Sequence, residues 1–77
     1  MRLVDAVYKR IVDLAKERKL TINALANLSG VPRSTIVTMT KSSTVKLSTL
    51  YGICDGLNIT LQDFFNSPLF SKENIED

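Results

Sequence analysis

The strongest constraint on the fold lies between residues 22 and 40, where two short apolar repeats are separated by a very short connection. Apolar side chains recur at helical spacing up to Leu28 and resume after Gly30-Val31-Pro32. Glycine readily adopts the left-handed backbone that closes a helix, and proline suits the first turn of the next one. The sequence therefore predicts helices over about 22–29 and 32–40, with Thr21 as the N-cap of the first. Together the two helices form a helix-turn-helix, in which the small side chain of Ala26 lets them cross closely.

Three further segments have helical periodicity, over residues 3–18, 47–57 and 61–65. Thr60 followed by Asp63 resembles a capping box before the last of them, and Pro68 ends it. Residues 40–46 are rich in hydroxyls and predict a loop. The predicted fold is all-α, with five helices. The fourth helix is expected to bury Leu47 and Cys54, and the predicted core consists of Val4, Val7, Ile11, Leu14, Leu25, Ala26, Val31, Ile36, Leu50, Ile53, Leu57, Ile59, Leu61 and Phe64.

The length of 77 residues suits one compact domain. We assign residues 1–66 to it and residues 67–77 to an acidic C-terminal tail, which is expected to be partly ordered at most. The tail nevertheless contains Leu69 and Phe70, which with Phe65 make more apolar surface than a monomer should expose. Either these side chains form a two-fold interface or the two phenylalanines fold back on the core.

Charge is distributed unevenly along the chain, although the net charge is only +2. The stretch 18–54 contains five Lys or Arg residues and no Asp or Glu, whereas residues 55–77 carry a balance of −4. The middle of the chain therefore suits a polyanion, and the C-terminal end does not.

Several classes of function are disfavoured by what the chain contains. With no histidine and a single cysteine, Cys54, we expect no metal site, no internal disulfide and no cofactor. No nucleophile motif or carboxylate pair indicates catalysis, and a domain this small has little room for a substrate pocket, so neither an enzyme nor a small-molecule ligand is expected. No apolar run reaches the roughly 18 residues of a membrane span, so a cytoplasmic protein is expected.

The stretch Thr21-Ile-Asn-Ala-Leu-Ala-Asn-Leu-Ser-Gly-Val-Pro-Arg-Ser-Thr-Ile36 resembles the helix-turn-helix of the lambda-repressor-like family, which includes phage repressors, Cro proteins and XRE-type regulators. Residues 53–65 resemble the family's fourth and fifth helices, and the resemblance covers about residues 5–66. Many members open the second helix with glutamine, where this chain has Ile22, and carry Asn-Gly or Lys-Gly where it has Thr40-Lys41-Ser42. The resemblance implies binding to double-stranded DNA as a repressor-like transcriptional regulator.

In such proteins the third helix lies in the major groove, which makes its outer face the candidate for base contacts. Arg33 can donate to guanine O6 and N7 together, or else form a surface ion pair or a phosphate contact. Val37 suits a thymine methyl group or packing against a neighbour. Ser34 and Thr38 can reach bases or phosphates, or bond only their own backbone. The flanking candidates for phosphate contacts are Thr21, Asn23, Lys41, Ser42, Ser43 and Lys46.

Two functions remain open from the sequence. The first is a regulator that binds a nearly palindromic operator as a homodimer. The second is a protein-interaction module of the antitoxin or anti-repressor kind. The acid-free stretch from Arg18 to Cys54 favours DNA.

Overall fold

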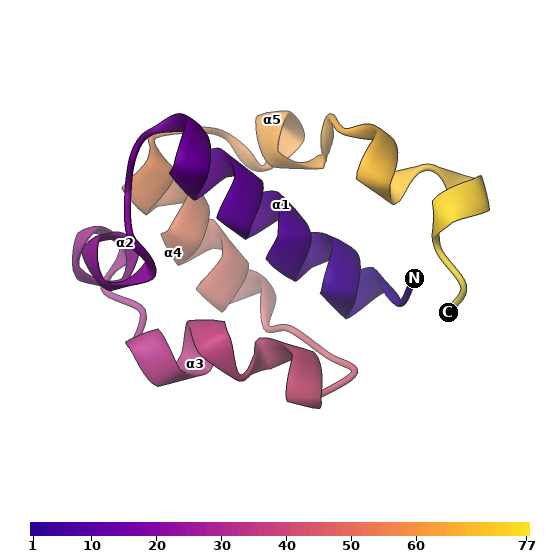
Figure 1. Cartoon of the computed structure of the whole chain (residues 1–77), viewed down its shortest axis with the longest axis horizontal. Helices are drawn as coiled ribbons and strands as arrows, with labels where there is room; N and C mark the ends of the chain where they lie inside the picture. Colours follow the sequence, from indigo (N-terminus) through magenta and orange to yellow (C-terminus); the bar gives the residue numbers. More distant parts are fainter.

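The computed structural model describes residues 1–77 as an all-helical molecule with principal dimensions of 33 × 23 × 20 Å. Its α-helices are α1 (Leu3–Glu17), α2 (Ile22–Ser29), α3 (Arg33–Val37), α4 (Leu47–Leu57) and α5 (Leu61–Phe65). Three 3₁₀ turns follow α3 and α5: η1 (Met39–Lys41), η2 (Pro68–Phe70) and η3 (Lys72–Asn74). In Figure 1, α1 and α4 run beside each other, α2 lies at their left end, α3 lies below them, and α5 and the C-terminal turns lie above them. The five predicted helices are therefore confirmed.

The helix ends are fixed by local bonds that the sequence indicated. The Thr21 hydroxyl accepts a hydrogen bond from the backbone of Ala24 at 3.0 Å, and Gly30 closes α2 with a φ of +71°. At α5 the capping box is complete, since Thr60 and Asp63 bond each other's backbone N–H groups. The predicted caps of α2 and α5 are confirmed, and they set where each helix begins.

One apolar core joins all five helices and contains no buried polar side chain. Twelve of the predicted core residues are buried, while Ile59 and Leu61 are only partly buried at its edge. The prediction was wrong for Leu47, which is 74% exposed because it is the first residue of α4 and stands beyond the end of the core. Four further residues are buried: Ala6, Ala15, Met39 and Cys54, of which Cys54 confirms the burial predicted for it on the fourth helix.

The helix predicted over 32–40 is shorter than expected, since α3 ends at Val37. Thr38 has φ −105° and ψ 4°, and both its N–H (3.1 Å) and its hydroxyl (2.6 Å) donate to the carbonyl of Ser34. A threonine that bonds back to the carbonyl four residues earlier tends to bend a helix. The chain continues as the tighter turn η1, which keeps Met39 in the core.

The C-terminal tail is more ordered than the sequence predicted. The ring of Phe70 lies 5.9 Å from Phe64 and 4.9 Å from Phe65, measured between centroids, and packs against the core. The Asp77 carboxylate accepts a hydrogen bond of 2.9 Å from the backbone of Leu3 at the start of α1. The two phenylalanines thus fold back on their own chain, and the termini lie near each other (Figure 1).

Candidate nucleic-acid interface

The helix-turn-helix consists of α2, α3 and the three residues between them. Leu25 and Ile36 are fully buried and anchor one helix each in the core. Gly56 lets α4 approach α2, because a Cβ built at Gly56 would lie only 2.9 Å from the N and Cα atoms of Ser29. The core thus fixes α2 from behind and leaves the outer surface of α3 free.

The outer surface of α3 presents most of the predicted base-contacting residues to solvent. Arg33, Ser34 and Thr38 are exposed, and Val37 is half-buried. Thr35 is also exposed, although the sequence analysis did not select it. Its position within the five residues of α3 was the only signal in the sequence that could have identified it.

The hydroxyl of Thr38 is already used within the helix. It donates to the Ser34 carbonyl at 2.6 Å, which is the backbone alternative that the sequence left open. The Thr38 oxygen can therefore offer a ligand only its acceptor side while this bond is intact. Ser34 has no such internal hydroxyl bond and stays available as a donor.

A polar hollow of about 490 Å³ opens between α2 and the start of α3. Its lining includes Asn23, Arg33 and also Asn27, which lies one helical turn after Asn23. Asn27 was missed by the sequence analysis, although its spacing of four residues from Asn23 was a usable signal. Two amide side chains and a guanidinium therefore face one solvent-filled space.

A second hollow, of about 410 Å³, lies between the segment after α3 and the start of α4. It gathers Ser42 and Lys46 from the predicted phosphate-contacting set, together with Thr38. Its remaining polar lining is made of threonines that we had not assigned to the site: Thr35, Thr44 and Thr49. Hydroxyls and one ammonium group thus line this side of the interface.

The other three predicted phosphate-contacting residues lie outside both hollows. Thr21 caps α2, and Lys41 projects from η1 into solvent. Ser43 instead borders an apolar groove of about 120 Å³ beside Leu47 and Phe65.

The cations of this surface have no carboxylate partners. Arg33, Lys41 and Lys46 are exposed and form no ion pair and no side-chain hydrogen bond within the protein. Arg18, at the start of the acid-free stretch, is different because its guanidinium donates to the last carbonyl of α4, that of Leu57, at 3.1 Å. Three unpaired cations therefore lie on α3 and the loop that follows it, while the other unpaired cations, Lys16, Lys19 and Lys72, lie on other parts of the chain.

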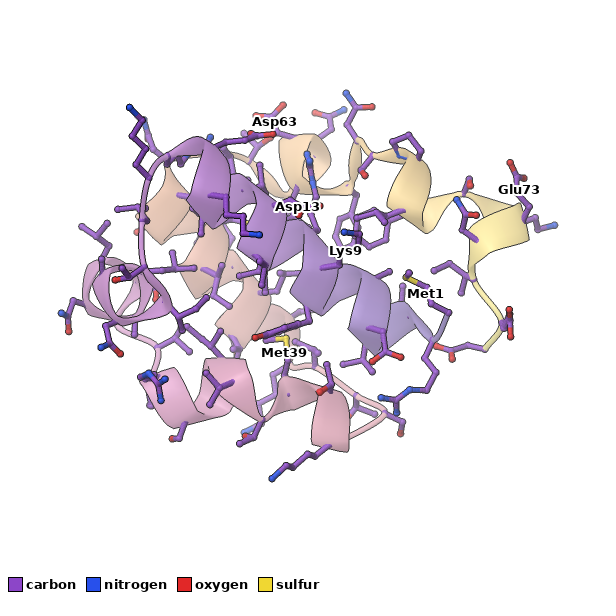
Figure 2. All side chains as sticks on the ribbon, viewed as in Figure 1. Met1, Lys9, Asp13, Met39, Asp63 and Glu73 are labelled. Atoms are coloured by element: carbon purple, nitrogen blue, oxygen red, sulfur yellow. The ribbon has the colours of Figure 1, made fainter.

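The acidic side chains of α5 and the C-terminal turns lie away from α3. Asp63 and Glu73 lie along the edge formed by α5 and the C-terminal turns, opposite α3 (Figure 2). No group of three or more His, Cys, Asp or Glu side chains is placed to hold a metal ion, and no helix is long and apolar enough to cross a membrane. The arrangement has the charge separation expected of a surface that meets a polyanion.

In a comparison with known protein families, residues 10–68 match the Cro/C1-type HTH DNA-binding domain. The matched region runs from the middle of α1 to η2 and includes the whole helix-turn-helix. No curated protein and no solved structure gives a significant match.

Proposed function

The chain belongs to the family of Cro/C1-type helix-turn-helix DNA-binding domains, and from this premise we propose that it binds operator DNA in the major groove as a repressor-like transcriptional regulator. The observation that carries the proposal is the set of three unpaired cations on and after α3: Arg33, Lys41 and Lys46. An exposed cation without a carboxylate partner has no internal bond to break before it meets a phosphate or a base. No catalytic step is needed for such a role.

We assign base reading to the outer face of α3. Arg33 is its first residue, and the N-terminal residues of a recognition helix are the ones that reach base edges. A free guanidinium can donate two parallel hydrogen bonds to guanine. Ser34, Val37 and Thr38 complete this assignment, with Val37 against a thymine methyl group.

We assign phosphate contacts to the groups that flank α3: Thr21, Asn23, Lys41, Ser42, Ser43 and Lys46. Asn23 lies beside Arg33 at one hollow, and Ser42 and Lys46 line the other, on the far side of α3. Contacts on both sides of a recognition helix would fix its register on the duplex.

The test distinguishes a contact with bases from a contact with phosphates. We expect Arg33→Ala to cost about 1–3 kcal/mol on a selected operator and much less on scrambled DNA, because only the correct base satisfies a bidentate contact. Lys46→Ala should weaken both complexes alike and make the salt slope shallower by about 0.9 per lost phosphate contact. Neither side chain has an internal partner, so neither change should disturb the fold.

A matched control is Lys72→Ala, which removes the same charge from η3 in the acidic tail. Its operator affinity should remain close to that of the unchanged protein. Equal losses for Arg33→Ala on both duplexes would reduce Arg33 to a phosphate contact. A chain that binds no duplex even at low salt would favour the alternative role of a protein-interaction module.

We further propose that the operator-bound form is a homodimer. The support is an apolar surface at the start of α4, where Leu47 is 74% and Tyr51 62% exposed and where Phe65 borders the adjoining groove. No charged residue lines that groove. This suits a two-fold interface, in which the same surface patch of each subunit contacts the other and like charges would repel. The two α3 helices should then sit about 34 Å apart, one turn of duplex. Sedimentation that shows only a monomer, with and without DNA, would contradict the dimer.

A further inference from the structure

The side chain of Arg2 connects the start of α1 to the turn that follows α3. Its Nε and Nη2 atoms donate to the two carboxylate oxygens of Asp5 at 3.1 and 3.0 Å. The same Nη2 donates to the backbone carbonyl of Thr40 at 2.6 Å. One planar guanidinium therefore holds a carboxylate on α1 and a carbonyl in η1, 38 residues away along the chain.

The Thr40 carbonyl has no other donor. The N–H groups of Lys41 and Ser42 donate to the carbonyls of Thr38 and Met39, at 3.0 and 3.2 Å, but no backbone N–H reaches the carbonyl of Thr40. The backbone bonding of η1 ends there, and Arg2 satisfies the carbonyl that the turn leaves open. Arg2 is thus a tertiary hydrogen-bond anchor at the point where the chain leaves η1.

Little else restrains the loop beyond this point. Its side-chain hydrogen bonds are local, since the Ser42 hydroxyl bonds the N–H of Thr44 at 3.2 Å and lies 3.3 Å from the Thr44 hydroxyl. Ser42, Ser43 and Thr44 are exposed, and Val45 is the next side chain that packs against the core. Beyond the backbone hydrogen bonds of η1 itself, the position of Lys41 and Ser42 therefore depends on the buried Met39 and on the bond from Arg2.

Asp5 orients the guanidinium that makes this bond. The carboxylate accepts two hydrogen bonds in the planar arrangement that suits arginine and not lysine. The bond from Arg2 also lowers the pKa of Asp5, because it favours the charged form of the carboxylate. Asp5 itself lies on α1 and is not one of the residues assigned to the DNA-binding surface.

We propose that Arg2, held by Asp5, is a positioning residue for the DNA-contacting loop. By fixing the Thr40 carbonyl it orders Lys41 and Ser42 before DNA arrives, which reduces the entropy lost on binding. Its effect on DNA rests on the proposed function of the domain. The clasp of Arg2, Asp5 and Thr40 is a feature of the protein alone and can be tested without DNA.

The variant Asp5→Ala separates positioning from charge by the sign of its effect. It raises the net charge by one, so through charge alone it should strengthen binding to DNA. Loss of the clasp should instead weaken binding about threefold to tenfold, which corresponds to the net contribution of one ordinary intramolecular hydrogen bond. Asp13→Ala is the matched control, because it removes the same charge from the same helix, where Asp13 pairs with Lys9 at 3.6 Å.

The affinity measurement uses fluorescence anisotropy with a labelled mixed-sequence duplex at one fixed salt concentration. We expect Asp13→Ala to bind at least as tightly as the unchanged protein and Asp5→Ala to bind more weakly than the unchanged protein. Arg2→Lys, which keeps the charge and loses the fork, should fall with Asp5→Ala. Binding by Asp5→Ala that equals or exceeds that of Asp13→Ala would overturn the proposal.

The DNA-free measurement is amide hydrogen exchange at Lys41 and Ser42, whose N–H groups are bonded within η1. Exchange there should become at least about fivefold faster in Asp5→Ala and Arg2→Lys than in Asp13→Ala, since a looser turn opens more often. Unchanged exchange in both variants would overturn the clasp. If the unchanged protein binds no duplex, the proposed function fails, while the exchange rates still decide whether Arg2 positions the loop.

Discussion

The contact between α2 and α4 gives the sharpest prediction for stability. A methyl group at Gly56 would lie 2.9 Å from the N, Cα and Cβ atoms of Ser29. Ordinary contacts between carbon atoms begin near about 3.5 Å, so α2 would have to move by about 0.6 Å. Two of the three atoms belong to the backbone, so no side-chain rotation can relieve the clash.

The expected magnitude follows from two opposing terms. Overpacking of a tight contact costs about 1–3 kcal/mol, and the backbone clash places this case in the upper half of that range. Replacing a helical glycine by alanine stabilises the helix by up to about 1 kcal/mol. Gly56→Ala should therefore lower the free energy of unfolding by about 1–2 kcal/mol, which for a domain of this size lowers Tm by roughly 4–15 °C.

Gly52 provides the matched comparison, one turn earlier on the same helix. A Cβ there meets the Cγ2 of Val31 at 3.4 Å and the carbonyl oxygen of Ser29 at 3.5 Å, which are ordinary contacts. Gly52→Ala should keep the gain in helix propensity and raise the free energy of unfolding by about 0.5–1 kcal/mol. Urea unfolding followed by circular dichroism measures both variants. A Gly56→Ala protein as stable as Gly52→Ala would refute the reasoning.

Three further predictions concern the core and the titratable groups. Ile36→Ala removes a fully buried side chain from α3 and should cost about 2–5 kcal/mol, enough largely to unfold so small a domain, as thermal melting would show; a melt unchanged from the parent protein would contradict this. Burial raises the pKa of the Cys54 thiol above its ordinary value of 9.0, so its reaction with a disulfide reagent at neutral pH should be limited by unfolding. The stability that the buried, protonated thiol contributes should be lost as pH rises through the raised pKa. The hydrogen bond from Arg2 lowers the pKa of Asp5, so the stability it contributes is present above the ordinary value of 3.8 and is lost as pH falls through the lowered pKa; the difference in melting temperature between the parent and Asp5→Asn should persist at about pH 6 and shrink progressively as the pH is taken below 3.8.

The elements whose boundaries were predictable are those whose end signals are local. Thr21 and Thr60 cap their helices through groups three residues away, and Gly30 supplies a backbone conformation that needs no distant partner. Helical spacing likewise identified the buried faces of α1, α2 and α4, because a helix repeats its contacts every three to four residues. The exposed face of α3 followed from the same periodicity, which is why most candidate DNA contacts could be named from the sequence.

The sequence left open every feature that depends on a distant partner. Arg33 and Arg18 both belong to the acid-free stretch and cannot be distinguished by sequence. The fold leaves the Arg33 guanidinium without a partner, whereas it brings the carbonyl of Leu57 within reach of Arg18. Thr35 and Thr49 share a hollow only because α4 returns beside the segment after α3.

The sequence by itself determined the presence of the five helices, the caps of α2 and α5 and the helix-turn-helix, since each depends on interactions within a few residues. Tertiary structure decided the folding of the acidic tail onto Phe64, the exposure of Leu47 and the clasp of Arg2 on the Thr40 carbonyl. These contacts join groups that are far apart in the chain, so no pattern of neighbouring residues encodes them. Only the packed arrangement of the helices brings their atoms within reach.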